Sequence, residues 1–116
     1  MKAATLTTVE GQTVCGRCLI ADRPWTRMRG LLGRSSLESG EGILLRPAGS
    51  IHMFFMRFAI DAIFCDSELV VIDVVRELRP GKMAARKGAK VVIELAAGAA
   101  SCLAAGDRLA LATIEP

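Results

Sequence analysis

The sequence of 116 residues contains no tyrosine, one tryptophan and one histidine. A single imidazole cannot build a histidine-based metal centre, because such centres need several nitrogen or sulfur ligands. Also absent are the phosphate-binding loop of the P-loop NTPases, the dinucleotide-binding glycine fingerprint and the serine-nucleophile elbow. These absences exclude the corresponding enzyme classes, and we expect neither a metal nor a cofactor.

Long apolar runs are also missing. No segment reaches the roughly 18 apolar residues that a membrane helix requires. The longest uncharged run, residues 95–106, consists mostly of alanine and glycine, and residues 1–8 have no apolar stretch of the kind found in signal peptides. The sequence therefore predicts a cytoplasmic protein without a membrane partner.

What the sequence does have is apolar side chains, which make up 52% of its residues. This fraction excludes disorder, and the length suits one domain, residues 1–116, with its own core. The net charge is +3, and residues 76–90 hold six basic residues against one acid. This basic segment suits an anionic partner, but no aromatic residue interrupts it, so we expect no nucleic-acid binding.

The apolar runs predict mainly strands. β-rich segments separated by turn residues are typical of strands, and they occur at residues 5–9, 14–21, 43–46, 60–65, 68–75, 91–95 and 108–114. Asp66-Ser67 predicts a two-residue hairpin turn. The segment that follows, 68–75, is apolar at successive positions, so we expect both of its faces to be covered.

Helical patterns are short and few. Asp22 can cap a helix in which Trp25, Met28 and Leu32 share one face, and residues 99–104 can form one or two further turns. Together with the strands, these segments predict an α+β, mostly β fold. We expect a small, barrel-like, largely antiparallel sheet with one or two short helices.

Four stretches match the motifs of one family, in the same order. Arg29-Gly30-Leu31-Leu32-Gly33-Arg34 is similar to its Arg-Gly-Leu-Met-x-Arg motif, and Met56-Arg57 before Ile60-Asp61 is similar to its second signature. Residues 93–98 and 103–109 correspond to its Leu-Glu-Leu-Pro-Ala-Gly and Gly-Asp blocks. The chain therefore resembles the uncharacterised family known as domain of unknown function 192.

This resemblance covers residues 19–116 and leaves residues 1–18 as additional N-terminal strands. Leu32 replaces the usual methionine, Ala96 replaces the usual proline, and Asp66-Ser67 stands where the family often has an Asp-x-Asp-Gly turn. The resemblance implies a small β-barrel-like fold with short helical insertions. It implies no particular reaction.

The segment from His52 to Asp61 is the strongest candidate for a site. It places an imidazole, the Arg57 guanidinium and a carboxylate among three phenylalanines and two methionines. Charged groups in apolar surroundings must be paired or must face a cleft. Asp61 is therefore either a structural partner that holds a loop, or part of a ligand pocket. We expect that pocket to be lined by Arg29, His52, Met56, Arg57, Asp61 and Glu94.

Two further patterns bear on chemistry. Glu94 interrupts an apolar strand, so His52 with Asp61 or Glu94 could perform acid–base work, although the spacing is too loose for a metal site. The Cys15–Cys18 pair has the spacing of a zinc knuckle or a redox motif. No second cysteine pair is present, and a strand rather than a helix follows, which favours ordinary thiols.

From the residues alone we expect a non-enzymatic binding or accessory domain. Its partner would be a small molecule, a peptide or a protein that occupies the candidate pocket. The alternative is a small hydrolase or isomerase that uses His52 with Asp61 or Glu94. The sequence leaves the oligomeric state open.

Overall fold

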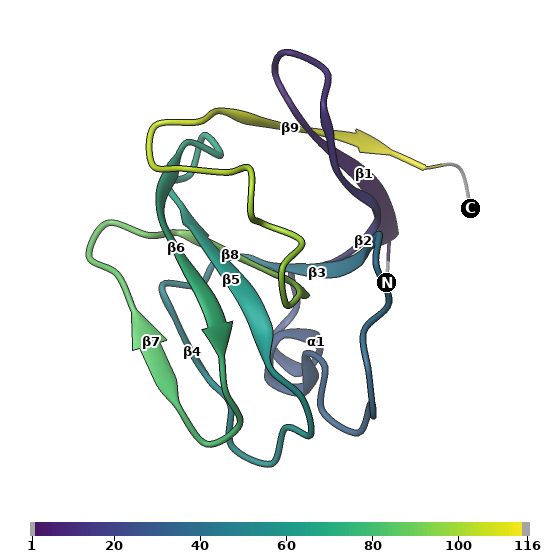
Figure 1. The fold of residues 1–116 in the computed structure, drawn as a ribbon, viewed down its shortest axis with the longest axis vertical. Coiled ribbons are helices and arrows are strands. Elements are labelled where there is room, and N and C mark those ends of the chain that lie inside the picture. Colours follow the sequence, from purple (N-terminus) through teal and green to yellow (C-terminus); the bar gives the residue numbers. More distant parts are fainter. Residues whose placement is uncertain (1, 115–116) are drawn as a thin grey trace.

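A computed structural model describes residues 2–114 and shows one large sheet with a small hairpin beside it (Figure 1). The seven-stranded sheet has the order β6-β5-β8-β3-β2-β1-β9, and β4 pairs with β7 alone. The elements are β1 (Lys2–Thr8), β2 (Thr13–Ala21), α1 (Pro24–Arg29), β3 (Glu41–Leu45), β4 (Ser50–His52), β5 (Ile60–Cys65), β6 (Val71–Leu78), β7 (Met83–Ala85), β8 (Val91–Ala96) and β9 (Leu109–Thr113).

The sheet is largely antiparallel, as expected, and strongly curved. Only β2 and β3 run parallel, because α1 and the loop after it carry the chain back between them. The two edge strands approach each other at a single bridge between Val70 and Arg108. The mostly β, α+β prediction is therefore confirmed, with an open, barrel-like sheet that does not close.

The hairpin of β5 and β6 differs from the prediction. Five residues, 66–70, connect the strands instead of two, because Asp66 organises a wider turn. Its Oδ1 accepts hydrogen bonds from the backbone N–H groups of Glu68 and Val70, at 2.9 and 3.0 Å. Residues 72–75 of β6 are only half-buried, since β6 lies at the edge of the sheet and is not covered on both faces.

The helical predictions need a similar correction. Only α1 is a helix within residues 2–114, and residues 99–104 form turns instead. α1 has six residues and ends at Arg29, with Gly30 as its C-cap, so it does not reach Leu32. Trp25 and Met28 are exposed rather than packed, with 61% and 75% of their surfaces accessible, and no residue of this short helix is buried.

The core is divided by the sheet. One cluster of apolar side chains packs where β1, β2 and β9 curl over the central strands, and the other lies beneath α1 and the β4–β7 hairpin. The central strands β5 and β8 contribute alternate residues to both clusters, as the two-residue period of a strand requires. This second cluster forms the base of the candidate site.

Candidate functional site

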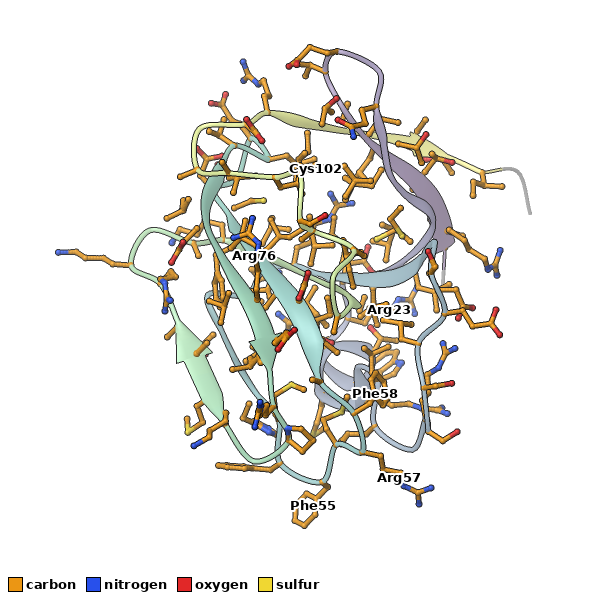
Figure 2. The ribbon with its side chains drawn as sticks, viewed as in Figure 1. Arg23, Phe55, Arg57, Phe58, Arg76 and Cys102 are labelled. Atoms are coloured by element: carbon orange, nitrogen blue, oxygen red, sulfur yellow. The ribbon has the colours of Figure 1, made fainter. Side chains whose placement is uncertain are left out.

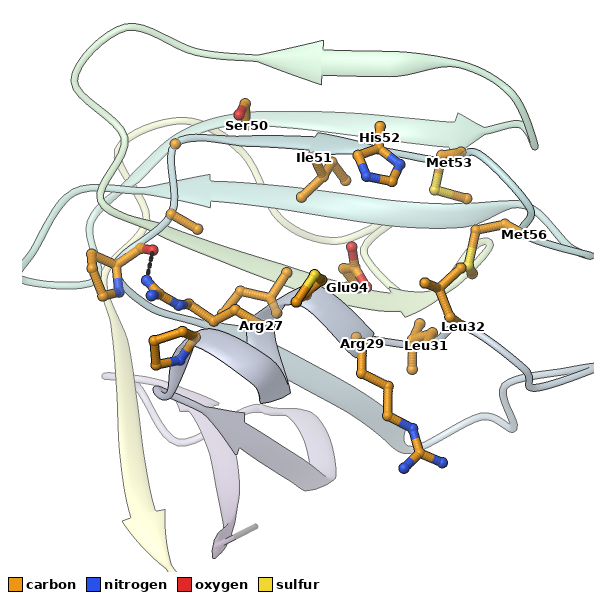
Figure 3. A pocket seen from close by; sticks show the side chains of 17 residues that line it. Arg27, Arg29, Leu31, Leu32, Ser50, Ile51, His52, Met53, Met56 and Glu94 are labelled. Atoms are coloured by element: carbon orange, nitrogen blue, oxygen red, sulfur yellow. Dashed lines mark hydrogen bonds between the residues drawn. The ribbon is translucent and has the colours of Figure 1, made fainter.

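A cleft of about 480 Å³ opens between α1 and β4 (Figure 3). One wall is formed by α1 and the residues that directly follow it. The other wall includes residues 47–53, which contain β4. Most of its walls are apolar. The lining residues are Pro24, Arg27, Met28, Arg29, Gly30, Leu31, Leu32, Leu45, Pro47, Ala48, Gly49, Ser50, Ile51, His52, Met53, Met56 and Glu94.

Glu94 places a carboxyl group at the base of this cleft. Its side chain leaves β8 towards α1 and is 6% exposed, and its Oε1 lies 3.9 Å from the position that a Cβ atom on Gly30 would occupy. Within residues 2–114 the carboxyl group makes no hydrogen bond or ion pair with the protein. Its oxygens are not among the fully buried polar atoms, so they are open to the cleft. Burial alone raises the pKa of Glu94 to about 7, since burial disfavours the charged form.

His52 lies across the cleft from Glu94, near the rim (Figure 3). Its ring is exposed and stacks on Phe54, with ring centroids 4.9 Å apart. Its Nδ1 accepts a hydrogen bond from the Phe54 N–H at 3.4 Å, which leaves the proton of a neutral ring on Nε2. His52 can therefore donate to a ligand at the cleft mouth.

The two arginines of α1 contribute unequally. Figure 3 shows the Arg29 guanidinium directed away from the cleft, so Arg29 lines it without offering its charge. Arg27 spans the end of the cleft, where its Nη1 donates to the carbonyl oxygen of Pro47 at 3.0 Å. The buried Nε of Arg27 has no partner among the described residues.

Met56 lines the cleft, whereas Arg57 and Asp61 do not. Arg57 is exposed on the loop before β5 (Figure 2). Asp61 is fully buried, and its hydrogen bonds come from backbone donors. Its Oδ1 accepts from Glu77 N–H, and its Oδ2 accepts from Gly98 N–H and Ala100 N–H, all at 3.0 Å. Of the two roles considered for Asp61, these contacts fit the structural one. Asp61 holds the loop after β8 against β5 and β6.

The cysteines form no ligand cluster. No group of three or more histidine, cysteine or acidic side chains within residues 2–114 is arranged to hold a metal ion. Cys15 and Cys18 are buried free thiols, and a bulge in β2 brings both to the core side of the strand. Their mutual hydrogen bond lowers the pKa of Cys15 and raises that of Cys18.

Sequence reasoning identified Arg29, His52, Met56 and Glu94, and these four do line one cleft. It missed the opposite wall, which Leu45 and residues 47–51 supply. Those residues are ordinary apolar or small side chains, and nothing in their pattern indicates that they face a helix 20 residues earlier in the chain. Only the parallel pairing of β2 and β3 brings them there.

The fold and the cleft thus define a mostly β protein with a buried acid at the base of an apolar cleft. The profile of the DUF192 family, described as "Uncharacterized ACR", matches residues 5–111, and the chain belongs to this family. The match includes most of β1 and β2, beyond the segment expected from the motifs. A UPF0127 protein of Thermococcus sibiricus is 38% identical over 107 residues, which cover 86% of this chain and 69% of that protein.

Solved structures share the fold. A candidate transcription regulator from Sinorhizobium meliloti superposes with a TM-score of 0.81 at 22% identity, over 95% of this chain and 92% of that one. A protein of unknown function from Novosphingobium aromaticivorans gives a TM-score of 0.79 at 21% identity, over 93% and 83% of the two chains. At these identities the likeness concerns the fold alone.

Proposed function

We propose that this protein is a binding domain whose cleft between α1 and β4 accepts an apolar group that ends in an ammonium or another hydrogen-bond donor. The observation that carries the proposal is the Glu94 carboxyl group, which faces the base of the cleft and makes no hydrogen bond or ion pair with residues 2–114. Buried polar groups in folded proteins are normally hydrogen-bonded. A ligand that donates to Glu94 would supply the missing partner.

The shape and chemistry of the cleft support such a ligand. A volume of about 480 Å³ is in the usual range for sites that take small molecules or single side chains. The apolar walls suit an alkyl chain, and a charged ligand end would favour the ionised form of Glu94. His52, at the rim, can bind a second polar group of the same ligand.

The catalytic alternative has less support from the same geometry. Asp61 cannot act as an acid or a base in the cleft, because it lies outside the lining and its two oxygens accept three hydrogen bonds from backbone N–H groups. This leaves only His52 and Glu94, on opposite sides of the cleft. The Nδ1 atom of His52 is occupied by a local backbone contact, and no carboxylate orients the ring.

Hexylammonium and hexanol are suitable probes, because both fill the apolar walls and only the first carries a charge. Amide chemical shifts measured during titration at about pH 8, where Glu94 is ionised, report binding residue by residue. We expect hexylammonium to shift the amide signals of residues on α1 and β4. It should bind about tenfold more tightly than hexanol. The preference should disappear in Glu94→Gln.

Glu68→Gln is the matched control, because Glu68 is a glutamate with 73% of its side chain exposed and lies outside the cleft. This variant should keep the preference for hexylammonium. Absence of shifts at the cleft with both probes would overturn the proposal. Equal binding of the two probes would show that the cleft binds apolar groups without using Glu94.

A further inference from the structure

A second surface lies apart from the base of the cleft, at the end of the molecule where two loops meet. The loop before β5 and the turn before β7 are joined by backbone hydrogen bonds, from Met53 N–H to the Lys82 carbonyl oxygen at 2.7 Å and from Gly81 N–H to the Met53 carbonyl oxygen at 2.8 Å. Residues 53–58 and 79–83 therefore form one continuous end of the protein, called here the Phe55 tip.

Phe55 occupies this tip in an unusual way. It is the third residue of a turn closed by a hydrogen bond from Met56 N–H to the Met53 carbonyl oxygen, at 3.2 Å, and its φ angle is +65°. Glycine or asparagine is favoured at such a position, and large side chains are rare. The ring is 90% exposed and projects from the end of the molecule (Figure 2). Neither the turn nor the core accounts for a phenylalanine here.

Further apolar surface adjoins Phe55. Phe54 is 42% exposed and stacks on His52, and Met83 is 67% exposed and lies opposite His52 in the β4–β7 pairing. Phe54 and Met83 therefore both adjoin His52, close in the chain to Phe55. Exposed apolar side chains gathered in one place usually mark an interaction surface.

The charges at the tip are all of one sign. Arg57, Arg79 and Lys82 are exposed on its two loops, and residues 50–60 and 79–90 contain no acidic residue. An anionic partner is therefore complementary to this surface. The tip is also convex, so a protein partner would need a matching hollow, and a nucleic acid finds no groove for its backbone.

We propose that the Phe55 tip docks on the surface of an anionic lipid bilayer, with the Phe55 ring inserted between headgroups and the three cations bound to lipid phosphates. A bilayer yields to a protruding ring without a preformed pocket, and aromatic rings flanked by lysine and arginine are suited to the headgroup region.

This contact differs from membrane spanning. The expectation of no membrane partner rested on the lack of a long apolar run, and no helix within residues 2–114 is long and apolar enough to cross a membrane. A surface contact needs only a few inserted side chains and electrostatic attraction. The tip shares Met53 and Met56 with the lining of the cleft, whereas Glu94 lies at the base of the cleft beside α1.

Co-sedimentation with vesicles tests the proposal. The full chain should sediment with phosphatidylcholine vesicles that contain phosphatidylglycerol, should remain in solution with pure phosphatidylcholine, and should be released by high salt. Phe55→Gly should weaken the association about tenfold or more. Because glycine suits the +65° φ angle, Phe55→Gly should unfold at an equal or higher urea concentration than the wild type, which separates lost binding from lost folding.

Two further variants complete the test. Replacing Arg79 and Lys82 together by glutamine should weaken binding to the anionic vesicles, whereas Trp25→Ala, which removes an exposed aromatic ring on α1, should not. No association with anionic vesicles, or equal association of Phe55→Gly, overturns the proposal. Binding of a fluorescent oligothymidylate that is lost in Phe55→Gly, without vesicle binding, would overturn it in favour of nucleic acid.

Discussion

Two buried carboxyl groups on neighbouring strands have opposite surroundings. In the pairing of β5 with β8, Asp61 lies opposite Leu95 and Ala62 lies opposite Glu94, so the two acids are one position apart along the ladder. Side chains alternate between the faces of a sheet, and the acids therefore point to opposite sides. Asp61 meets three backbone donors, whereas Glu94 meets an open cleft.

The comparison shows how to interpret a buried acid. A buried carboxylate whose two oxygens both accept from backbone N–H groups, and which lines no cleft, contributes to folding rather than to binding. A carboxyl group that is buried to the same degree without partners costs stability, and it is a candidate for binding. Burial alone does not separate the two roles, but the hydrogen-bond partners do.

The largest expected effect comes from Asp61→Ala. This change leaves three backbone N–H groups without their acceptor in a buried site, so we expect a loss of about 4 kcal/mol in the free energy of unfolding. Urea denaturation followed by circular dichroism measures it. Asp66→Ala, which also removes an acceptor of backbone hydrogen bonds but on an exposed turn, is the control and should cost far less. Similar losses for both variants would remove the distinction drawn for Asp61.

Glu94→Gln should change the pH dependence of stability. The pKa of Glu94 in the folded state is about 7, above the value of about 4.3 in an unfolded chain. Between these two pH values the folded state keeps a proton that the unfolded state releases. The free energy of unfolding therefore falls as the pH rises through this range. The wild type should therefore lose up to about 3 kcal/mol between about pH 5 and about pH 8, relative to Glu94→Gln. Urea denaturation of both proteins at the two pH values gives this difference. Parallel pH profiles would mean that Glu94 already has a partner.

Arg76→Met tests the other contacts that hold the Asp61 region. The Nη2 of Arg76 donates to the carbonyl oxygens of Ala100 and Leu103, at 3.2 and 2.6 Å. Methionine keeps the aliphatic stem and removes both bonds, so we expect a loss of about 1–2 kcal/mol in the free energy of unfolding. Amide hydrogen exchange at residues 100–103 should increase, with no change at residues of the cleft. Faster exchange at the cleft instead would indicate that the two regions are coupled.

The smallest effect is expected at a surface acid. Glu41 forms an ion pair with Arg34 at 3.0 Å, and about a third of each side chain is exposed. Solvent screens such pairs, so Arg34→Met should cost less than about 1 kcal/mol in urea denaturation. The cost should fall further at high salt. A loss as large as that for Asp61→Ala would show that exposure is a poor guide to the strength of acid contacts in this protein.

In the 52–61 segment, the need of Asp61 for a partner could be predicted from the sequence, but the identity of that partner could not. Sequence reasoning identified a polar group that needs a partner at Asp61, and the structure supplies that partner as backbone from two distant segments, 77 and 98–100. It placed Arg57 with Asp61 in one pocket, whereas Arg57 lies on an exposed loop next to Phe55. Neither outcome follows from spacing along the chain, because both depend on which strands become neighbours.

The sequence by itself determined the mostly β fold, since alternation, apolar runs and turn residues are local properties. It also indicated that Asp61 and Glu94 would lie in apolar surroundings, because each interrupts an apolar strand. Only the tertiary structure decided their roles. Strand register sends neighbouring side chains to opposite faces of the sheet, and the order of strands decides whether backbone amides or an empty cleft lies on each face.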